Sequence, residues 1–197
     1  MPLTPIAAPQ PTFTAKADGK IRWTVQTWQR AYDAGLFGLW DRYELLDGEL
    51  YYVPTSSPQH DSTIENLVES LRELLAAQSF KVREEKVVYI ADDSTPRPDI
   101  SIVTQQNYRD RHAAPADVYL IIEVCQTSYI NDLDLKPSIY AAAGIPEYWV
   151  VHLKNEQIKR FYNPVDGKYQ ETVLTSAVNI AGVDIAAAEM LAIAFGS

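Results

Sequence analysis

The chain has 197 residues, of which 47% are hydrophobic and 22% charged, so it can bury the core of one folded domain. No uninterrupted apolar run reaches the roughly 20 residues of a membrane-spanning helix, and we expect no membrane partner. The formal net charge of −9 argues against binding of nucleic acid over a broad basic surface. It does not exclude a metal-dependent nuclease, because such a site needs carboxylates and depends on the local field.

The start of the chain and its cysteine content bear on the cellular compartment. The first five residues lack the basic start and the long apolar stretch of a secretory signal. Cys125 is the only cysteine, so no intramolecular disulfide can form. We therefore expect a cytoplasmic protein.

The first third of the chain predicts an arm, a helix and a hairpin. Residues 1–20 contain four prolines and little apolar periodicity, which predicts a flexible N-terminal arm. Thr24 can cap a helix, because apolar side chains recur at helical spacing after it. Residues 42–46 and 49–53 flank an Asp-Gly pair, which is a strong signal for a β-hairpin.

The rest of the chain predicts an α/β domain with an additional hairpin near its end. The expected elements are an amphipathic helix at about 60–77, strands at about 80–89, 98–103 and 118–125, a helix at about 132–143, a strand at 147–153, a hairpin of 157–162 with 169–174, and a tail helix at 185–194. No repeat or linker divides the sequence, so residues 21–197 are expected to form a single domain.

Two carboxylates stand at the ends of predicted strands. Asp99 opens one strand after Pro98, and Glu123 closes the almost continuously apolar strand that begins at Val118. A carboxylate at the end of a buried strand is costly unless it is paired or bound to a metal. If the strands are neighbours, Asp99 and Glu123 converge at one edge of the sheet and offer the oxygen ligands that Mg²⁺ prefers.

A positive charge is expected from the helix that follows. Alternation along the strand places four side chains on one face of the sheet: Tyr119, Ile121, Glu123 and Cys125. On the predicted helix, Asp132, Lys136 and Tyr140 are spaced by four and therefore share a face. Lys136 can orient a water molecule or stabilise the charge that develops in a transition state.

Several sequence blocks, in a fixed order, carry a resemblance to a known family. They are Tyr43-Glu44-Leu45, Asp47-Gly48-Glu49, Pro58 with His60, Pro98-Asp99-Ile100, Ile122-Glu123-Val124, the set Asp132, Lys136 and Tyr140, and Gly144-Ile145-Pro146-Glu147-Tyr148-Trp149. Each block is weak alone, but the ordered set is specific. Over about residues 24–174 the chain resembles the Uma-type family of restriction endonucleases in the PD-(D/E)XK nuclease superfamily.

The resemblance implies a fold, a reaction and a set of site residues. The fold would be restriction-endonuclease-like, with a mixed central β-sheet flanked by helices and additional β-hairpins. Asp99 and Glu123 would hold Mg²⁺ or Mn²⁺, and Lys136 would replace the strand lysine whose place Cys125 occupies. Glu44 and His60 would be accessory residues near this site. The expected reaction is hydrolysis of DNA phosphodiester bonds by an endonuclease, and analogy suggests a homodimer.

Other interpretations stay open. The chain could be a catalytically silent member of the fold that binds DNA or protein, or a hydrolase of another phosphoester. His60 could simply cap the long helix or lie against Ile64, and Glu44 could be a partner of Arg42 across the strands or of a basic residue elsewhere. If nucleic acid binds, the candidate phosphate contacts are Arg97, Arg109 and Arg111.

Overall fold

The computed structural model describes residues 14–15, 19, 21–37, 43–126 and 131–196. Its centre is a six-stranded sheet with the order β10-β9-β8-β7-β6-β5. The strands are β5 (Phe80–Glu84), β6 (Ile100–Thr104), β7 (Val118–Cys125), β8 (Glu147–His152), β9 (Gln157–Val165) and β10 (Lys168–Val173). Only β7 and β8 run parallel, and the other neighbours are antiparallel. The predicted mixed central sheet is confirmed.

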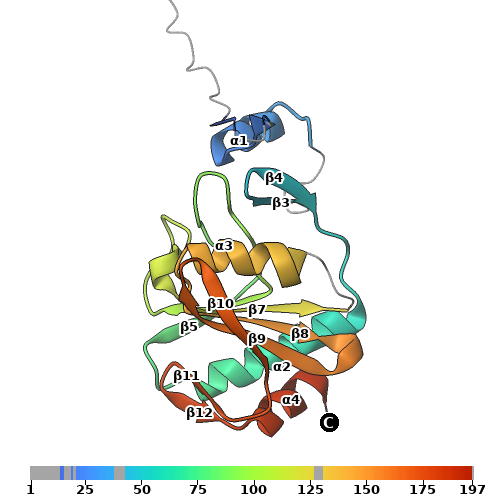
Figure 1. Ribbon diagram of the computed structural model, residues 1–197, viewed down its shortest axis with the longest axis vertical. Helices are drawn as coiled ribbons and strands as arrows, with labels where there is room; N and C mark the ends of the chain where they lie inside the picture. Colours follow the sequence, from blue (N-terminus) through green and yellow to red (C-terminus); the bar gives the residue numbers. More distant parts are fainter. Residues whose placement is uncertain (1–13, 16–18, 20, 38–42, 127–130, 197) are drawn as a thin grey trace, which may run out of the picture.

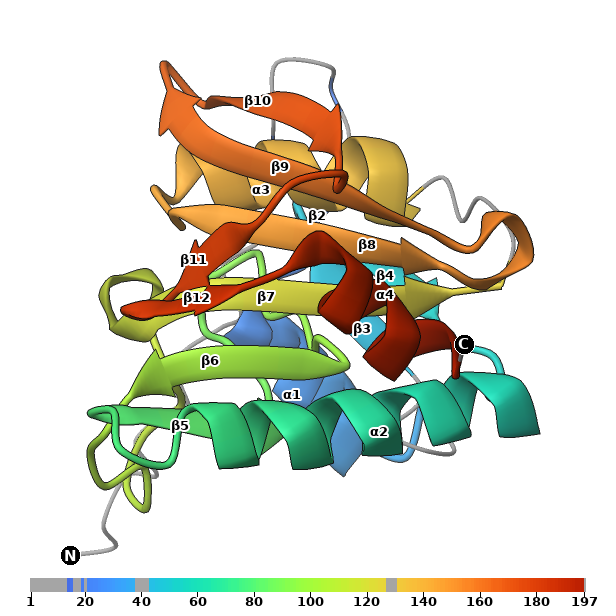
Figure 2. The same cartoon turned by 90° about the horizontal axis from the view of Figure 1, so that it is seen from below.

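Helices cover both faces of the sheet (Figures 1 and 2). On one face α2 (Pro58–Leu74) and α4 (Ala187–Phe195) enclose an aliphatic core with Leu67, Ile122 and Trp149 at its centre. On the other face α3 (Lys136–Ala142) covers a smaller core that includes Ile121 and Tyr140. No helix among these described residues is long and apolar enough to cross a bilayer.

The central strand β7 is buried on both faces, as its apolar sequence predicts. Its alternation is interrupted once, because the register with β6 shifts between Ile102 and Val103. Tyr119 consequently packs with the core on the α2 side, whereas Ile121 and Cys125 lie in the core under α3. The prediction that Tyr119 shares a face with Glu123 is therefore wrong, because a β-bulge changes the side on which residues before it point.

A smaller unit of short elements lies beyond α3 in Figure 1. It contains β1 (Thr14–Ala15), β2 (Ile21–Arg22), α1 (Val25–Asp33) and the hairpin of β3 (Tyr43–Leu46) with β4 (Glu49–Tyr52). Thr24 caps α1 as expected. The hairpin turns at Asp47 and Gly48, both with positive φ, and a Cβ at Gly48 would lie 2.5 Å from the Cβ of Arg22. Most of the predicted arm 1–20 lies outside the described residues.

Element boundaries differ from the sequence predictions in a few places. Helix α2 begins at Pro58 behind the cap Ser57, and β5 ends at Glu84, so the segment before Ile100 forms a loop. The helix predicted at about 132–143 starts as the π-helical turn η3 (Asn131–Leu135) and continues as α3. The sequence did not predict the small hairpin of β11 (Val178–Ile180) and β12 (Val183–Ile185).

Candidate active site

Asp99 and Glu123 lie side by side because β6 and β7 are antiparallel neighbours. Ile100 pairs with Ile122, so the residue before β6 stands beside the residue near the end of β7. Backbone hydrogen bonds connect the two carboxylates: the Asp99 N–H donates to Glu123 Oε2 at 3.4 Å, and the Val124 N–H donates to Asp99 Oδ2 at 2.7 Å. The strand ends thus hold both side chains in fixed positions at one edge of the sheet.

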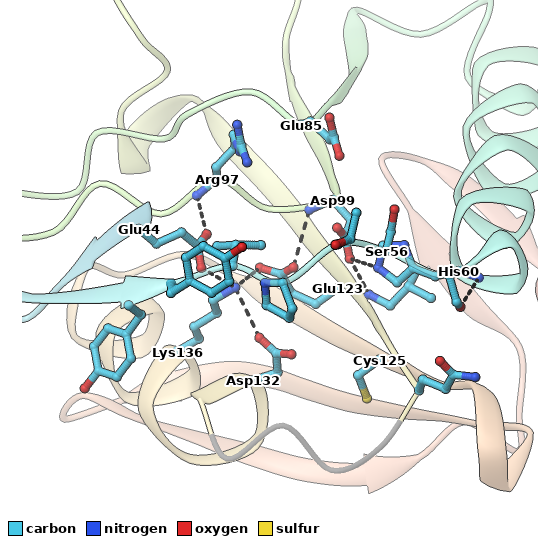
Figure 3. Close-up of a pocket in the computed structure, with 18 residues that line it drawn as sticks. Glu44, Ser56, His60, Glu85, Arg97, Asp99, Glu123, Cys125, Asp132 and Lys136 are labelled. Carbon is cyan, nitrogen blue, oxygen red and sulfur yellow. Dashed lines mark hydrogen bonds and ion pairs between the residues drawn. The ribbon is translucent and has the colours of Figure 1, made fainter. Parts of the chain in front are cut away.

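Lys136 reaches the same place from the helical layer. Its Nζ lies 2.8 Å from Glu123 Oε1, 3.1 Å from Asp132 Oδ1 and 3.2 Å from Glu44 Oε2. Only 6% of the lysine side chain is exposed. Figure 3 shows this ammonium between three carboxylates that come from three separate elements. We call Glu44, Asp99, Glu123, Asp132 and Lys136 the carboxylate–lysine cluster.

Local structure around Lys136 explains why it points inward. The π-helical turn η3 carries Asp132 on the same side as Lys136, four residues later. Pro137 lies in the first turn of α3, directly after the π-helical turn η3. Tyr148 donates a hydrogen bond to the backbone carbonyl of Asp132 at 2.8 Å and ties this turn to β8.

The two accessory residues also lie at this site. Glu44 Oε1 accepts a hydrogen bond from the Arg97 N–H at 2.7 Å, while its other oxygen contacts Lys136. His60 Nε2 lies 3.5 Å from Asp99 Oδ2, on the opposite side of the carboxylate pair from Lys136 (Figure 3). The helix cap is the side chain of Ser57, so His60 does not serve as the cap. Arg42, one alternative partner for Glu44, lies outside the described residues, and the basic residue elsewhere that Glu44 contacts is Lys136.

Burial and crowding of like charge dominate the electrostatics of the cluster. Burial raises the pKa of Glu123 well above its usual value; Lys136 opposes the rise, and the neighbouring carboxylates add to it. Burial also raises the pKa of Asp132. For Lys136, burial alone would lower the pKa, but Glu123, Glu44 and Asp132 outweigh it and raise the pKa well above the usual range. The lysine is thus charged, and three carboxylates share its single ammonium group.

A pocket of about 480 Å³ opens onto the cluster. All five residues of the cluster line it, together with His60, Arg97 and the segment that follows β4. Cys125 also reaches this pocket from the end of β7, although its side chain is mostly buried. The geometry therefore joins a solvent-accessible space to carboxylates that are otherwise enclosed by protein.

Asp132 lies at this site although its sequence context predicts no role for it there. The signal that could have identified it is its spacing of four from Lys136, which places both side chains on one face of the helix. Tyr140, the third residue of that set, is fully buried, and its hydroxyl has no hydrogen-bond partner among the described residues. Of the three arginines considered as phosphate contacts, Arg97 lines the pocket. Arg109 and Arg111 do not line it, and Arg111 forms an ion pair with Asp117.

The donor set suits a hard divalent cation bound by few protein ligands. Four carboxylates of the cluster face one lysine and one histidine, so negative charge is in excess. Within the described ranges, no group of three or more His, Cys, Asp or Glu side chains is placed to hold a metal ion, so at most two of these residues would bind it. A cation held by Asp99 and Glu123 would therefore keep most of its coordination positions for water and substrate oxygens, which is the arrangement Mg²⁺ favours.

Comparison with known proteins identifies the family. The family described as "Uma2: Putative restriction endonuclease" matches residues 26–189. This chain belongs to that family. The fold of this Uma2-family chain also resembles the crystal structure of "a putative nuclease belonging to DUF820" from Anabaena variabilis ATCC 29413, with a TM-score of 0.66 and 12% sequence identity. That match covers 87% of this chain and 99% of the other. No curated protein matches this Uma2-family sequence.

Proposed function

We propose that this Uma2-family chain is an endonuclease that uses Mg²⁺ or Mn²⁺ to hydrolyse DNA phosphodiester bonds. Asp99 and Glu123 are the proposed metal ligands, and Lys136 is the proposed catalytic cation. The observation that carries the proposal is the 2.8 Å contact between Lys136 Nζ and Glu123 Oε1, beside Asp99 and at the floor of a pocket. The family supports the nuclease class, and a buried lysine among carboxylates at a pocket is typical of a functional site.

The residues of the cluster divide the work of such a reaction. When bound, a divalent cation polarises the scissile phosphate and lowers the pKa of an attached water molecule. Asp99 and Glu123 supply its oxygen ligands, and the Val124 N–H keeps Asp99 oriented. The fixed positive charge of Lys136 stabilises the negative charge that develops on the phosphate in the transition state. Glu44 and Asp132 contact the same ammonium, so they position it from two further directions.

Closed circular DNA is the substrate that tests this proposal, because it has no ends for an exonuclease. Supercoiled plasmid and circular single-stranded DNA would be incubated with the protein and Mg²⁺, Mn²⁺ or EDTA. We expect cleavage with either metal and none with EDTA, and loss of cleavage in Asp99→Asn. Failure to cut either circle at any metal concentration, by a folded protein, would refute the nuclease assignment. A homodimer would cut both strands of the plasmid in one encounter. Linear plasmid that appears without a nicked intermediate would therefore support the expected homodimer.

A catalytically silent module is the second candidate. The net charge of −9 favours it, because an acidic protein binds duplex phosphates weakly. If this candidate is right, Lys136 and its carboxylates form a structural ion-pair network only. DNA or protein binding that is unchanged in Asp99→Asn and Lys136→Ala, with no cleavage by the wild type, would support it over the nuclease. A phosphoesterase acting on small esters would instead hydrolyse p-nitrophenyl phosphodiesters and leave DNA intact.

A further inference from the structure

The pocket has two chemically different walls. The carboxylate–lysine cluster forms the first. The second comes from β4 and the segment after it, where an uncharged and largely apolar run lines the space: Tyr51, Tyr52, Val53 and Pro54. A nucleotide has the same division, with an anionic phosphate at one end and a flat apolar base face at the other. A volume of about 480 Å³ lies within the range of pockets that enclose small-molecule ligands.

Tyr51 is the aromatic residue of this wall that faces the cluster. It pairs directly with Glu44 across the β3–β4 hairpin, so the two side chains lie on the same face. Glu44 on that face reaches Lys136 at 3.2 Å, which places the Tyr51 ring on the same side of the hairpin as the lysine. The Tyr51 hydroxyl donates a hydrogen bond to Glu49 Oε2 at 3.0 Å and anchors the far end of the ring. The ring itself is half-buried and lines the pocket.

Aromatic packing stiffens the hairpin from its other face. Tyr52 contacts Tyr43 edge-on with ring centroids 5.7 Å apart, Tyr43 contacts Phe37 at 5.3 Å, and Phe37 contacts Trp23 at 5.9 Å. Such edge-to-face pairs are favourable beyond their buried area. The chain of rings connects β4 to the segments on either side of α1, so the wall that carries Tyr51 is held in place before any ligand arrives. Preorganisation of this kind lowers the entropy lost on binding.

The charges that line the pocket disfavour a duplex. Five lining residues are acidic, namely Glu44, Glu85, Asp99, Glu123 and Asp132, whereas the basic ones are His60, Arg97 and Lys136. Affinity for double-stranded DNA comes mainly from neutralising phosphates with Lys and Arg. Affinity for unpaired nucleotides also comes from stacking on aromatic rings, which requires no positive charge. In addition, only 5% of the Glu123 side chain and 6% of Lys136 are exposed, so the reacting phosphate must enter the pocket.

We infer that the pocket takes a DNA nucleotide whose base is unpaired, with the phosphate at Asp99 and Glu123 and the base stacked against Tyr51. The preferred substrate is therefore single-stranded DNA or an unpaired stretch within a duplex. In a base-paired stack both faces of a base are covered by its neighbours, so Tyr51 can contact only a base that has left the stack. This inference rests on the proposed function for the phosphate end and adds the class of DNA.

Binding tests the inference without any need for turnover. A fluorescein-labelled single-stranded oligonucleotide, the matching duplex, and the duplex with a central unpaired loop would be titrated with protein in Ca²⁺. Fluorescence anisotropy should give at least about tenfold tighter binding for the single strand and the looped duplex than for the full duplex. Equal affinity for all three DNAs, or tighter binding of the full duplex, overturns the inference.

Variants at Tyr51 test the stacking surface itself. Tyr51→Ala should weaken single-strand binding by about tenfold or more, and Tyr51→Phe should keep it, because the phenyl ring retains the stacking face. Tyr89→Ala is the matched control: Tyr89 is also half-buried and its hydroxyl also donates to a nearby carboxylate, that of Asp92, but it does not line the pocket. An unchanged affinity in Tyr51→Ala, with a thermal melt showing a folded protein, also overturns the inference.

Cleavage in Mg²⁺ or Mn²⁺ separates this inference from the proposed function. If the full duplex is cut as fast as the single strand, the unpaired-substrate inference fails and the nuclease assignment stands. If the single strand binds through Tyr51 but is never cut, the nuclease assignment fails and the inferred occupant of the pocket stands.

Discussion

Two ion-pair groups in this chain use similar chemistry in different surroundings. Lys136 is enclosed with three carboxylates, and both Lys136 and Glu123 expose only a few per cent of their side chains. In the loop before β7, Arg111 donates to both oxygens of Asp117, with contacts of 2.5 and 3.0 Å, and 47% of the arginine is exposed. Arg111 lowers the pKa of Asp117 to about 2, whereas burial raises the pKa of Glu123 well above its usual value.

The opposite directions of the two pKa shifts follow from the partners of each carboxylate. Asp117 has one cationic partner, a backbone donor at Ala114 and the amide of Gln106, so its charged form is fully satisfied. Glu123 has to share one ammonium with two other carboxylates, and only 5% of its own side chain is exposed. In an ion pair that only stabilises a loop, the positive and negative charges are expected to be matched. Carboxylates kept in excess at the end of a pocket are typical of a functional site.

Removing the lysine should have the largest effect of the changes considered. In Lys136→Ala we expect turnover of DNA to fall between about a hundredfold and a thousandfold, because one preorganised charge at the reacting phosphate is lost. Steady-state cleavage of a fluorogenic oligonucleotide measures this turnover, and Arg111→Ala, which removes the exposed cation, is the control.

Cys125→Ser should leave turnover within a small factor of wild type. Activity retained in Lys136→Ala would assign the catalytic charge to another residue.

The same lysine should also matter for stability, and the exposed arginine should not. Lys136→Met leaves buried carboxylates without their counter-charge, and we expect the free energy of unfolding to fall by about 2 kcal/mol. This value lies below the usual range for a broken buried pair because the pocket admits water and Glu123 can bind a proton. Arg111→Met should leave stability essentially unchanged, since an exposed pair contributes little. Urea denaturation in EDTA at pH 7 compares the two, and equal losses would contradict the distinction between the groups.

Metal affinity tests the excess of carboxylates directly. Asp99→Ala and Glu123→Ala should each weaken Mn²⁺ binding at least about tenfold, and the double variant should lose little more than either single one, because the two ligands act as a unit. Isothermal titration calorimetry gives the affinities. Asp117→Ala removes a carboxylate of the exposed pair and should bind Mn²⁺ like the wild type. Unchanged binding in both Asp99→Ala and Glu123→Ala would exclude them as ligands.

The part of the site formed by strand ends and one helix could be predicted from the sequence. Asp99 and Glu123 meet because antiparallel neighbours bring the start of one strand beside the end of the next, so the strand assignments predict the contact once the two strands are taken as neighbours. Lys136 and Asp132 share a face through a spacing of four. Their placement against the sheet follows from the apolar side of α3. The metal and catalytic roles of these residues stay predictions.

Features that depend on distant segments or weak turn signals could not be predicted. The β3–β4 hairpin forms its own sheet, so no local pattern shows that Glu44 reaches Lys136, and only the family resemblance placed Glu44 near the site. The β-bulge that turns Tyr119 away results from the register with β6. The hairpin of β11 and β12 was missed because its turn places Ala181 at a φ of 52°, a conformation usually taken by Gly, Asn or Asp. Asn179 Oδ1 compensates by accepting the Gly182 N–H at 3.0 Å.

The smallest expected effect concerns the pH dependence of the exposed pair. Because the folded-state pKa of Asp117 is about 2, below its ordinary value of 3.8, the pair stabilises the protein above pH 3.8 and loses this contribution as the pH falls through about 2. Its size should be small, since solvent screens the pair. Carboxyl NMR titration of Asp117 measures the pKa, and Asp117→Asn should lower the free energy of unfolding at pH 6 slightly more than the exposed control Asp110→Asn. The difference should shrink in high salt. A titration midpoint for Asp117 near 4 would mean that its ion pair with Arg111 does not persist in solution. Of the two carboxylates compared, only Glu123 would then have a shifted pKa.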